Sequence, residues 1–180
     1  MQITQTNLPG VLVIQPKVFK DARGFFLETF QAERYRQAGI AANFVQDNHS
    51  RSQKGVLRGL HFQQTKPQGK LINVSQGAVY DVAADINPGS PTFGQYFGIE
   101  LSDVNHLQLW IPPGYAHGFC VLSDCADFHY RCTEYYDPQD EAGVLWSDPQ
   151  LNINWPITLP LLSEKDKQLP LLKDLLRHSL

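Results

Sequence analysis

Residues that could transfer protons or hold an anion are concentrated between Gln46 and Lys70. Within strand-like sequence, this stretch contains Gln46, Asn48, His49, Arg51, Arg58, His61 and Lys70. The ordinary pKa of histidine suits proton transfer near neutral pH, and lysine and arginine stabilise negative charge on oxygen. Such polar density in strand-like sequence indicates a wall of a wet cavity rather than a dry core.

His61 is the candidate base of this stretch. Under strict alternation Arg58 and His61 would face opposite sides of a strand. Gly59 lies between them and predicts a bulge or a close backbone approach, which would bring both side chains to one face. A lone histidine in a strand is more often a core residue. The presence of Arg58 and Lys70 in the same stretch favours a functional role for His61.

Two residues far along the chain could complete a proton-transfer site. Tyr130 alternates with Ala126, Phe128 and Cys132, so we expect it on the inward face of its strand, where it could act as an acid opposite His61. Asp166 could orient the second nitrogen of His61, and Lys70 could stabilise an enolate oxygen. The alternatives are a core aromatic for Tyr130 and solvated surface charges for Asp166 and Lys70.

Other candidates suit binding of a nucleotide. Arg23, Arg58 and Lys165 could contact phosphate oxygens, which suit the arginine fork. Phe26 and Glu28 lie two residues apart on one predicted strand face, where a base could stack and hydrogen-bond. Tyr135 and Tyr136 are expected at the mouth of the cavity. Asp81 is a weak candidate, because the sequence does not fix which face it occupies.

The composition favours a globular protein without a basic surface. The chain has 180 residues, 42% hydrophobic and 18% charged, with a formal net charge of −3. This balance disfavours general nucleic-acid binding, and the length suits one domain over residues 1–180. Three cysteines form no CxxC pair, which indicates reduced thiols, and no leader or membrane segment is recognisable. We therefore expect a cytoplasmic protein with no membrane partner.

Short strands separated by turn residues dominate the predicted structure. We expect strands at 10–19, interrupted at Pro16 as an edge strand or a bend, and at 24–30, then a short helix at 31–39 ended by Gly39. Eight further strands follow in residues 44–51, 55–63, 70–75, 78–86, 95–101, 106–112, 115–122 and 126–136. This spacing predicts a β-sandwich or barrel. Helical segments follow Ser163, a candidate N-cap, with a break at Pro170.

Two spacings resemble the motifs of the cupin superfamily of jelly-roll barrels, namely Gly55 to His61 and Pro112 through Gly114 to His117. The metal-binding members carry H-x-H and then a glutamate. Here Gln63 stands in the second position, and no glutamate lies between His61 and Lys70. A metal-dependent oxygenase is therefore disfavoured, because a transition metal needs several converging nitrogen or oxygen ligands.

Matched blocks over most of the chain resemble the dTDP-4-dehydrorhamnose 3,5-epimerase family. The blocks are RGFFLETF, FVQDNHSRS, GVLRGLHFQ, QGKL, DVAADI, SPTFGQ, QLWIPPGYAHGF, FHYRCTEYY and LSEKD, in the family's order. The resemblance implies a metal-free cupin jelly roll without a cofactor, acting as a homodimer in dTDP-L-rhamnose synthesis. It implies inversion of C3 and C5 in dTDP-4-dehydro-6-deoxy-D-glucose.

The resemblance also implies residue roles. His61 would be the base with Asp166 as its partner, Lys70 would face the enolate oxygen, and Tyr130 would be the acid. Arg23, Arg58 and Lys165 would lie near the diphosphate. Phe26, Glu28, Gln46 and Asn48 would surround the nucleotide or sugar, some of them across the dimer, His117 would lie near the sugar ring, and Tyr136 would belong to the binding set.

Departures from the family pattern lie outside the proposed proton-transfer set. Asn73 replaces a residue that is often charged, and Arg131 follows Tyr130 where lysine is common. Epimerases that invert a single carbon share most of these residues, so single-site action stays open. A sugar-nucleotide-binding protein without turnover is the further alternative.

Overall fold

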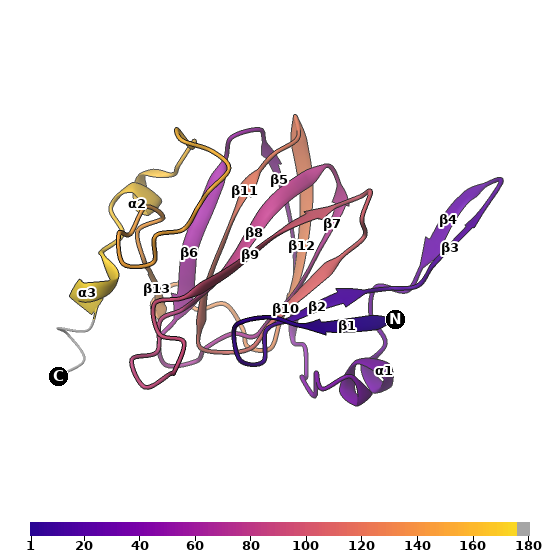
Figure 1. Cartoon of the computed structure of the whole chain (residues 1–180), viewed down its shortest axis with the longest axis horizontal. Helices are drawn as coiled ribbons and strands as arrows, with labels where there is room; N and C mark the ends of the chain where they lie inside the picture. The colour runs from indigo at the N-terminus through magenta and orange to yellow at the C-terminus, as the bar shows by residue number, and fades with distance from the viewer. Residues whose placement is uncertain (176–180) are drawn as a thin grey trace.

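Two antiparallel β-sheets face each other in the computed structural model, which describes residues 1–175 (Figure 1). The six-stranded sheet contains, in spatial order, β1 (Gln2–Gln5), β2 (Leu12–Gln15), β10 (Gln108–Ile111), β7 (Lys70–Gln76), β12 (Cys125–Cys132) and β5 (Gln46–Gln53). The five-stranded sheet contains β13 (Glu141–Gly143), β6 (Leu57–Gln63), β11 (Tyr115–Val121), β8 (Ala78–Asp85) and β9 (Tyr96–Ser102). The predicted double-sheet β class is confirmed.

Each of the eight strand runs predicted between residues 44 and 136 overlaps one observed strand. The predicted strand at 10–19 is divided at Pro16 into β2 and β3 (Val18–Asp21), so the bend was the correct alternative. An edge position for β2 is wrong, because β1 pairs with its outer side. β1 and β13 were not predicted from the sequence, and the three residues of β13 are too few for a periodic pattern.

A two-stranded hairpin projects from the body of the molecule (Figure 1). It pairs β3 with β4 (Gly24–Leu27), which ends three residues earlier than predicted. The predicted short helix is α1 (Ala32–Gln37), where the Gln31 side chain accepts a hydrogen bond from the Arg34 amide. Tyr35 of α1 is buried against Leu12, Ile14 and neighbouring residues on the outer face of the six-stranded sheet.

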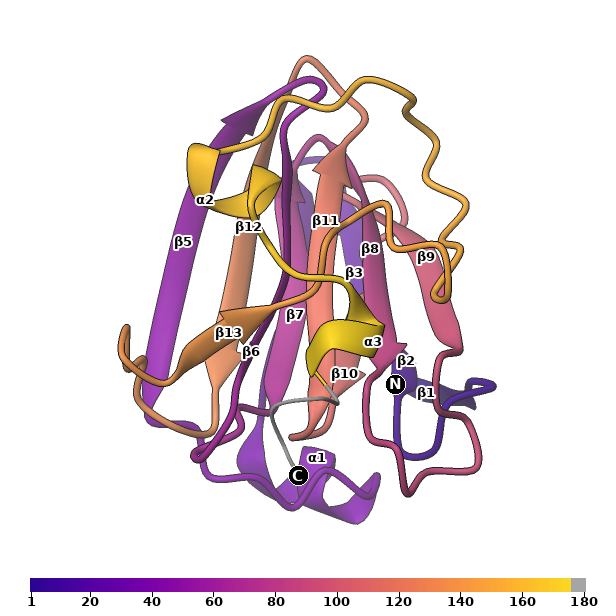
Figure 2. The same cartoon turned by 90° about the vertical axis from the view of Figure 1, so that its left-hand side faces the viewer.

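The main core lies between the sheets and follows the two-residue period of strands. On β12, Ala126 and Phe128 are buried in this core, and partly buried Tyr130 packs against it. The C-terminal segment, with α2 (Glu164–Lys167) and α3 (Leu172–Leu175), covers the outer face of the five-stranded sheet (Figure 2). Ser163 is the N-cap of α2, as predicted, and accepts a hydrogen bond from the Asp166 amide at 3.1 Å. The longest helix, α1, has six residues, so none of the helices within residues 1–175 could span a membrane.

A bulge in β6 is present at the predicted glycine. In the pairing of β11 with β6, His117 lies opposite His61 and Phe119 lies opposite Arg58. Two steps on β11 therefore match three steps on β6, and the extra residue brings both Arg58 and His61 to the same cavity. A Cβ atom at Gly59 would lie 2.6 Å from the Gly118 Cα and 2.7 Å from the His117 carbonyl oxygen.

We expect Gly59→Ala to lower the free energy of unfolding by about 3 kcal/mol or more, because backbone strain and overpacking each cost roughly 1–3 kcal/mol. Gly59 has a φ of +119°, and its clashing neighbours are backbone atoms that cannot move aside. Gly39→Ala is the matched control, because Gly39 has a φ of +92° with open space around its Cβ position. Urea unfolding of both variants checks this prediction, and equal losses would contradict the close-approach explanation.

Candidate active site

A cavity of about 540 Å³ opens between the two sheets. Both sheets and the C-terminal segment contribute to its wall, and apolar side chains such as Phe119 and Phe128 line part of it. Its ionisable and aromatic hydroxyl side chains are Arg58, His61, Lys70, His117, Tyr130, Tyr136, Glu141, Lys165 and Asp166. The structure therefore brings together the four candidate catalytic residues, which span 105 positions of sequence.

His61 and Asp166 form a hydrogen-bonded pair. His61 Nε2 lies 2.6 Å from Asp166 Oδ1, and Asp166 is 3% exposed. Burial alone would raise the pKa of Asp166, but its interactions with His61, the Ser163 hydroxyl and the Gly59 amide together hold the pKa below its usual value. Because the carboxylate accepts the Nε2–H, the lone pair of His61 is on Nδ1 and is available to a substrate.

The C-terminal segment is held in register so that Asp166 can reach His61. Val56 and Leu161 form an isolated parallel bridge. The Leu57 amide donates to the Leu161 carbonyl at 3.0 Å, and the Leu161 amide donates to the Gly55 carbonyl at 2.7 Å. This backbone pairing places the start of α2 beside β6, and the Ser163 cap then orients its first turn.

A second histidine–carboxylate pair lies deeper in the cavity. His117 Nε2 lies 3.0 Å from Asp81 Oδ2, and Asp81 is fully buried. Burial lowers the pKa of His117, although Asp81 opposes that shift. Asp81, whose orientation the sequence could not fix, therefore points inward and orients a cavity histidine.

Lys70 and Tyr130 face the cavity from adjacent strands of the six-stranded sheet. Lys70 is 9% exposed, and burial lowers the pKa of its ammonium group, with Asp81 and Glu141 opposing that shift. Burial raises the pKa of the Tyr130 hydroxyl, with Arg58 opposing. Tyr130 therefore stays protonated near neutral pH. His61 is on the facing sheet, so the two side chains approach the cavity from opposite walls.

Glu141 lines the cavity but was not predicted from the sequence as a site residue. Its carboxylate accepts a hydrogen bond from the Tyr136 hydroxyl at 2.7 Å and forms an ion pair with Lys165. Its Oε1 lies 3.8 Å from His61 Nδ1. Burial alone would raise the pKa of Glu141, but its contacts with Lys165, Tyr136 and His61 hold it below its usual value. Glu141 is the first residue of β13, and no spacing or motif in the sequence marked it.

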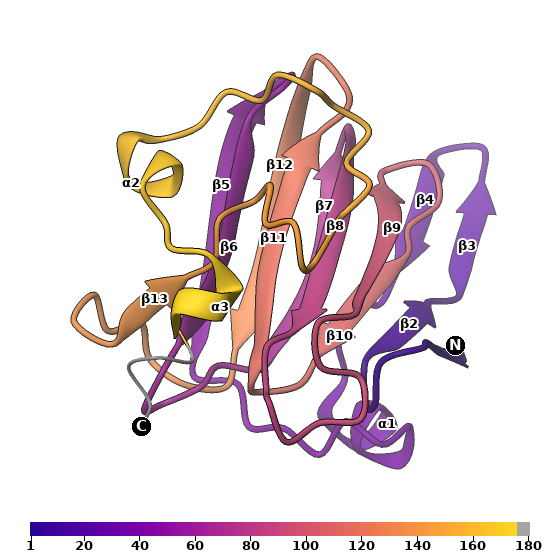
Figure 3. The ribbon, with the colours of Figure 1, turned by 60° about the vertical axis from the view of Figure 1, so that its left-hand side comes forward.

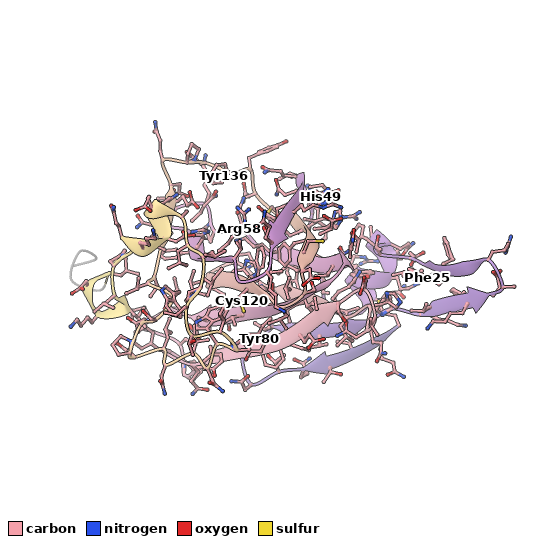
Figure 4. All side chains as sticks on the ribbon, turned by 90° about the horizontal axis from the view of Figure 1, so that it is seen from above. Phe25, His49, Arg58, Tyr80, Cys120 and Tyr136 are labelled. Atoms are coloured by element: carbon pink, nitrogen blue, oxygen red, sulfur yellow. The ribbon has the colours of Figure 1, made fainter. Side chains whose placement is uncertain are left out.

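Three candidate binding residues, in the projecting hairpin or directly after it, lie away from the cavity. Figures 1 and 3 show β3 and β4 on the opposite side of the molecule from α2. The Arg23 side chain is 90% exposed beside Asp21, and Phe26 is 68% exposed. Glu28 forms an ion pair with Arg34 at 2.5 Å. Figure 4 shows neighbouring Phe25 far from Arg58, which lies in the body of the molecule. Within one chain, Arg23, Phe26 and Glu28 therefore do not join the site.

Gln46 and Asn48 are near the cavity without lining it. The Gln46 side chain donates to Asn48 Oδ1 and accepts from the Tyr136 amide, both at 2.9 Å. Gln46 therefore positions the loop that carries Tyr136. Arg58 donates through Nε to the Ser52 hydroxyl at 3.1 Å, which orients its guanidinium along the cavity wall.

Gln63, which stands in the position of a cupin metal ligand, is used for structure. It is buried, donates to the Lys66 carbonyl at 2.8 Å, and accepts from the Asp137 amide at 2.9 Å. These bonds join β6 to the loops beside the cavity. No group of three or more His, Cys, Asp or Glu residues within 1–175 is placed to hold a metal ion.

Comparisons with known proteins give one family. The family model described as dTDP-4-dehydrorhamnose 3,5-epimerase matches residues 5–174. The chain is 54% identical over 168 residues to a protein of that name from Shigella flexneri, which covers 92% of this chain and 93% of the relative. It is 53% identical over 167 residues to one from Neisseria gonorrhoeae, covering 92% of this chain but 51% of that relative's length.

A solved structure agrees with the sequence comparisons. The dTDP-6-deoxy-D-glucose-3,5-epimerase from Legionella pneumophila Philadelphia 1, crystallised with dTDP-4-keto-L-rhamnose, is 54% identical. Its TM-score is 0.93, with 96% of this chain and 93% of the other covered. The match therefore extends over both sheets and the C-terminal segment that carries Asp166. This chain, with its cupin-type double sheet, belongs to the dTDP-4-dehydrorhamnose 3,5-epimerase family.

Proposed function

We propose that this protein inverts C3 and C5 of dTDP-4-dehydro-6-deoxy-D-glucose to give dTDP-4-dehydro-L-rhamnose, within dTDP-L-rhamnose synthesis. The observation that carries the proposal is the opposed placement of a histidine–aspartate pair and a protonated tyrosine in one cavity. His61, held by Asp166, is on the five-stranded sheet, and Tyr130 is on the six-stranded sheet. Inversion at a carbon needs a base on one face and an acid on the other.

The C4 ketone makes the protons on C3 and C5 acidic. His61 Nδ1 removes one of them, and the electron pair of the broken C–H bond passes to the C4 oxygen as an enolate. Asp166 stabilises the imidazolium that forms, in the way that a buried carboxylate orients a catalytic histidine. Tyr130 then gives its hydroxyl proton to the opposite face of the same carbon, and the carbonyl is restored.

We propose that the positive charge of Lys70 stabilises the enolate oxygen. Its amine is at the cavity wall and shielded from solvent, and a charge acts more strongly where water is excluded. His117, oriented by Asp81, is the proposed hydrogen-bonding partner of the sugar ring. Since each inversion returns the substrate to the same oxidation level, the residues above account for the reaction without a redox cofactor.

The nucleotide is proposed to bind across a homodimer. Arg58 and Lys165 line the cavity and would hold the diphosphate, while Tyr136 is at its exposed side. The exposed hairpin, which carries Arg23 and Phe26 and is followed directly by Glu28, extends away from its own cavity. We propose that it reaches the cavity of a second protomer near Gln46 and Asn48 on β5, one of the two edge strands of the six-stranded sheet. The working form is then a cytoplasmic dimer of single-domain protomers.

Solvent deuterium incorporation tests the proposed function. Incubated in D₂O with dTDP-4-dehydro-6-deoxy-glucose, the protein is expected to place deuterium at both C3 and C5 of an inverted product. NMR of the product resolves the two carbons. Incorporation at one carbon would support a single-site epimerase instead. Binding of dTDP with no incorporation at either carbon would leave a sugar-nucleotide-binding protein and overturn the enzymatic proposal.

A further inference from the structure

Inversion of two carbons in one binding event uses the same base and the same acid twice. Both groups must therefore return to their starting protonation states between the two inversions. After the first proton transfer His61 carries protons on both ring nitrogens, and it cannot act as a base again until one of them leaves. The Nε2 proton is held by Asp166, whose side chain is 4% exposed and offers little access to water. The proton taken from the sugar is on Nδ1, where the bound sugar covers the direct path to solvent.

Glu141 is the group that faces this second nitrogen. Its Oε1 is 3.8 Å from His61 Nδ1, and a movement of roughly 1 Å would bring the pair into hydrogen-bond range. Its other oxygen contacts Tyr136 and Lys165, whose side chains are about half exposed. Glu141 thus lies between the Nδ1 side of the imidazole and the solvent-exposed mouth of the cavity.

We propose that Glu141 accepts the extra proton of His61 between the two inversions, so that one binding event yields a doubly inverted sugar. The proposal rests on the proposed function. The Nδ1–H bond of the imidazolium breaks, the proton passes to Glu141 Oε1, and water at the mouth takes it from there. No electrons are transferred, and the neutral imidazole is restored. Solvent supplies the proton that restores Tyr130.

The contacts of Glu141 suit a transient carrier. Lys165 and Tyr136 both donate to its carboxylate, which keeps it ionised at rest and ready to accept a proton. The same contacts favour rapid release of that proton, since protonation of Glu141 would weaken both. Asp166, by contrast, is enclosed on the other side of the ring and serves to orient it.

The test compares Glu141→Gln with the unchanged chain on dTDP-4-dehydro-6-deoxy-glucose in D₂O, with products inverted at one and at two carbons counted separately by NMR. We expect the ratio of doubly to singly inverted sugar to fall at least about tenfold, since loss of a positioned proton carrier typically costs about 10²–10⁴-fold. Glu164→Gln is the matched control, because Glu164 is an exposed carboxylate that pairs with Lys167 and does not line the cavity. It should leave both the rate and the ratio unchanged.

Chemical rescue separates proton transfer from a structural role. Small carboxylates added to Glu141→Ala should restore the second inversion, with a rate that rises with the pKa of the added base. If Glu141→Gln fails to fold, Glu141→Asp takes its place and should give an intermediate ratio. A wild-type ratio in either variant, or no dependence on base strength, overturns the relay. Absence of inversion by the unchanged chain would instead overturn the proposed function.

Discussion

His61→Asn is expected to lower deuterium incorporation at both C3 and C5 by about 10²–10⁴-fold, the usual contribution of a positioned general base. Both carbons should be affected because the same Nδ1 is the acceptor for each proton. Asparagine keeps a short polar side chain near Asp166, so the buried carboxylate retains access to a donor. Binding of dTDP should stay near that of the unchanged chain, because Arg58 and Lys165 are untouched. Isothermal titration and NMR-detected exchange measure the two properties separately.

The matched control for this variant is His106→Asn. His106 is outside the cavity, and its φ of 54° is one that asparagine tolerates. This control should exchange both protons at the normal rate. Full exchange in His61→Asn would show that another group is the base. Loss of exchange at one carbon alone would assign separate bases to C3 and C5.

The strands could be predicted because each carries its own local signal. Alternation of apolar residues and punctuation by turn residues marked all eight runs between residues 44 and 136. The bulge at Gly59 was also predictable, since a glycine between two residues that need the same face has a clear physical explanation. These local signals explain why Arg58, His61 and Lys70 were correctly predicted in a cavity wall. Gln46, Asn48, His49 and Arg51 of the same stretch lie outside the lining of the cavity.

The convergence of the site depended on information that local patterns do not contain. The pairing of Leu161 with Gly55 and Leu57 brings Asp166 to His61 across 105 positions, and composition alone favoured a solvated residue there. The resemblance to a family supplied that contact. Glu141 had neither signal, because β13 is too short to show a period and the position of Glu141 in the cavity is defined by its contacts with Tyr136, Lys165 and His61.

The projecting hairpin shows a different limit of sequence reasoning. Arg23, Phe26 and Glu28 have the side-chain types that a nucleotide site needs, yet the folded chain directs them away from its own cavity. Residue type and strand face predict what a side chain can bind. They do not predict whether that side chain reaches the cavity of its own chain.

Tyr130→Phe is expected to separate proton exchange from inversion. His61 still removes the C3 and C5 protons, its imidazolium exchanges with solvent, and a deuteron returns to the face from which the proton left. The recovered sugar should therefore carry deuterium with its original configuration, while inverted product falls by about 10²-fold or more. Burial, which raises the pKa of Tyr130, keeps its hydroxyl protonated as an acid, and phenylalanine preserves the ring that packs against the core.

Tyr80→Phe provides the matched control for the loss of a partly buried hydroxyl. Tyr80 is on β8 and packs with the side chains between the five-stranded sheet and the C-terminal segment, away from the cavity. Burial raises its pKa as it does that of Tyr130. Its variant should invert the sugar at the normal rate. If Tyr130→Phe also inverts normally, the acid is another group or water. The placement of His61 and Tyr130 on opposite walls of the cavity then does not explain inversion. If it neither inverts nor exchanges, Tyr130 is needed before proton removal, and assignment of His61 as an independent base is wrong.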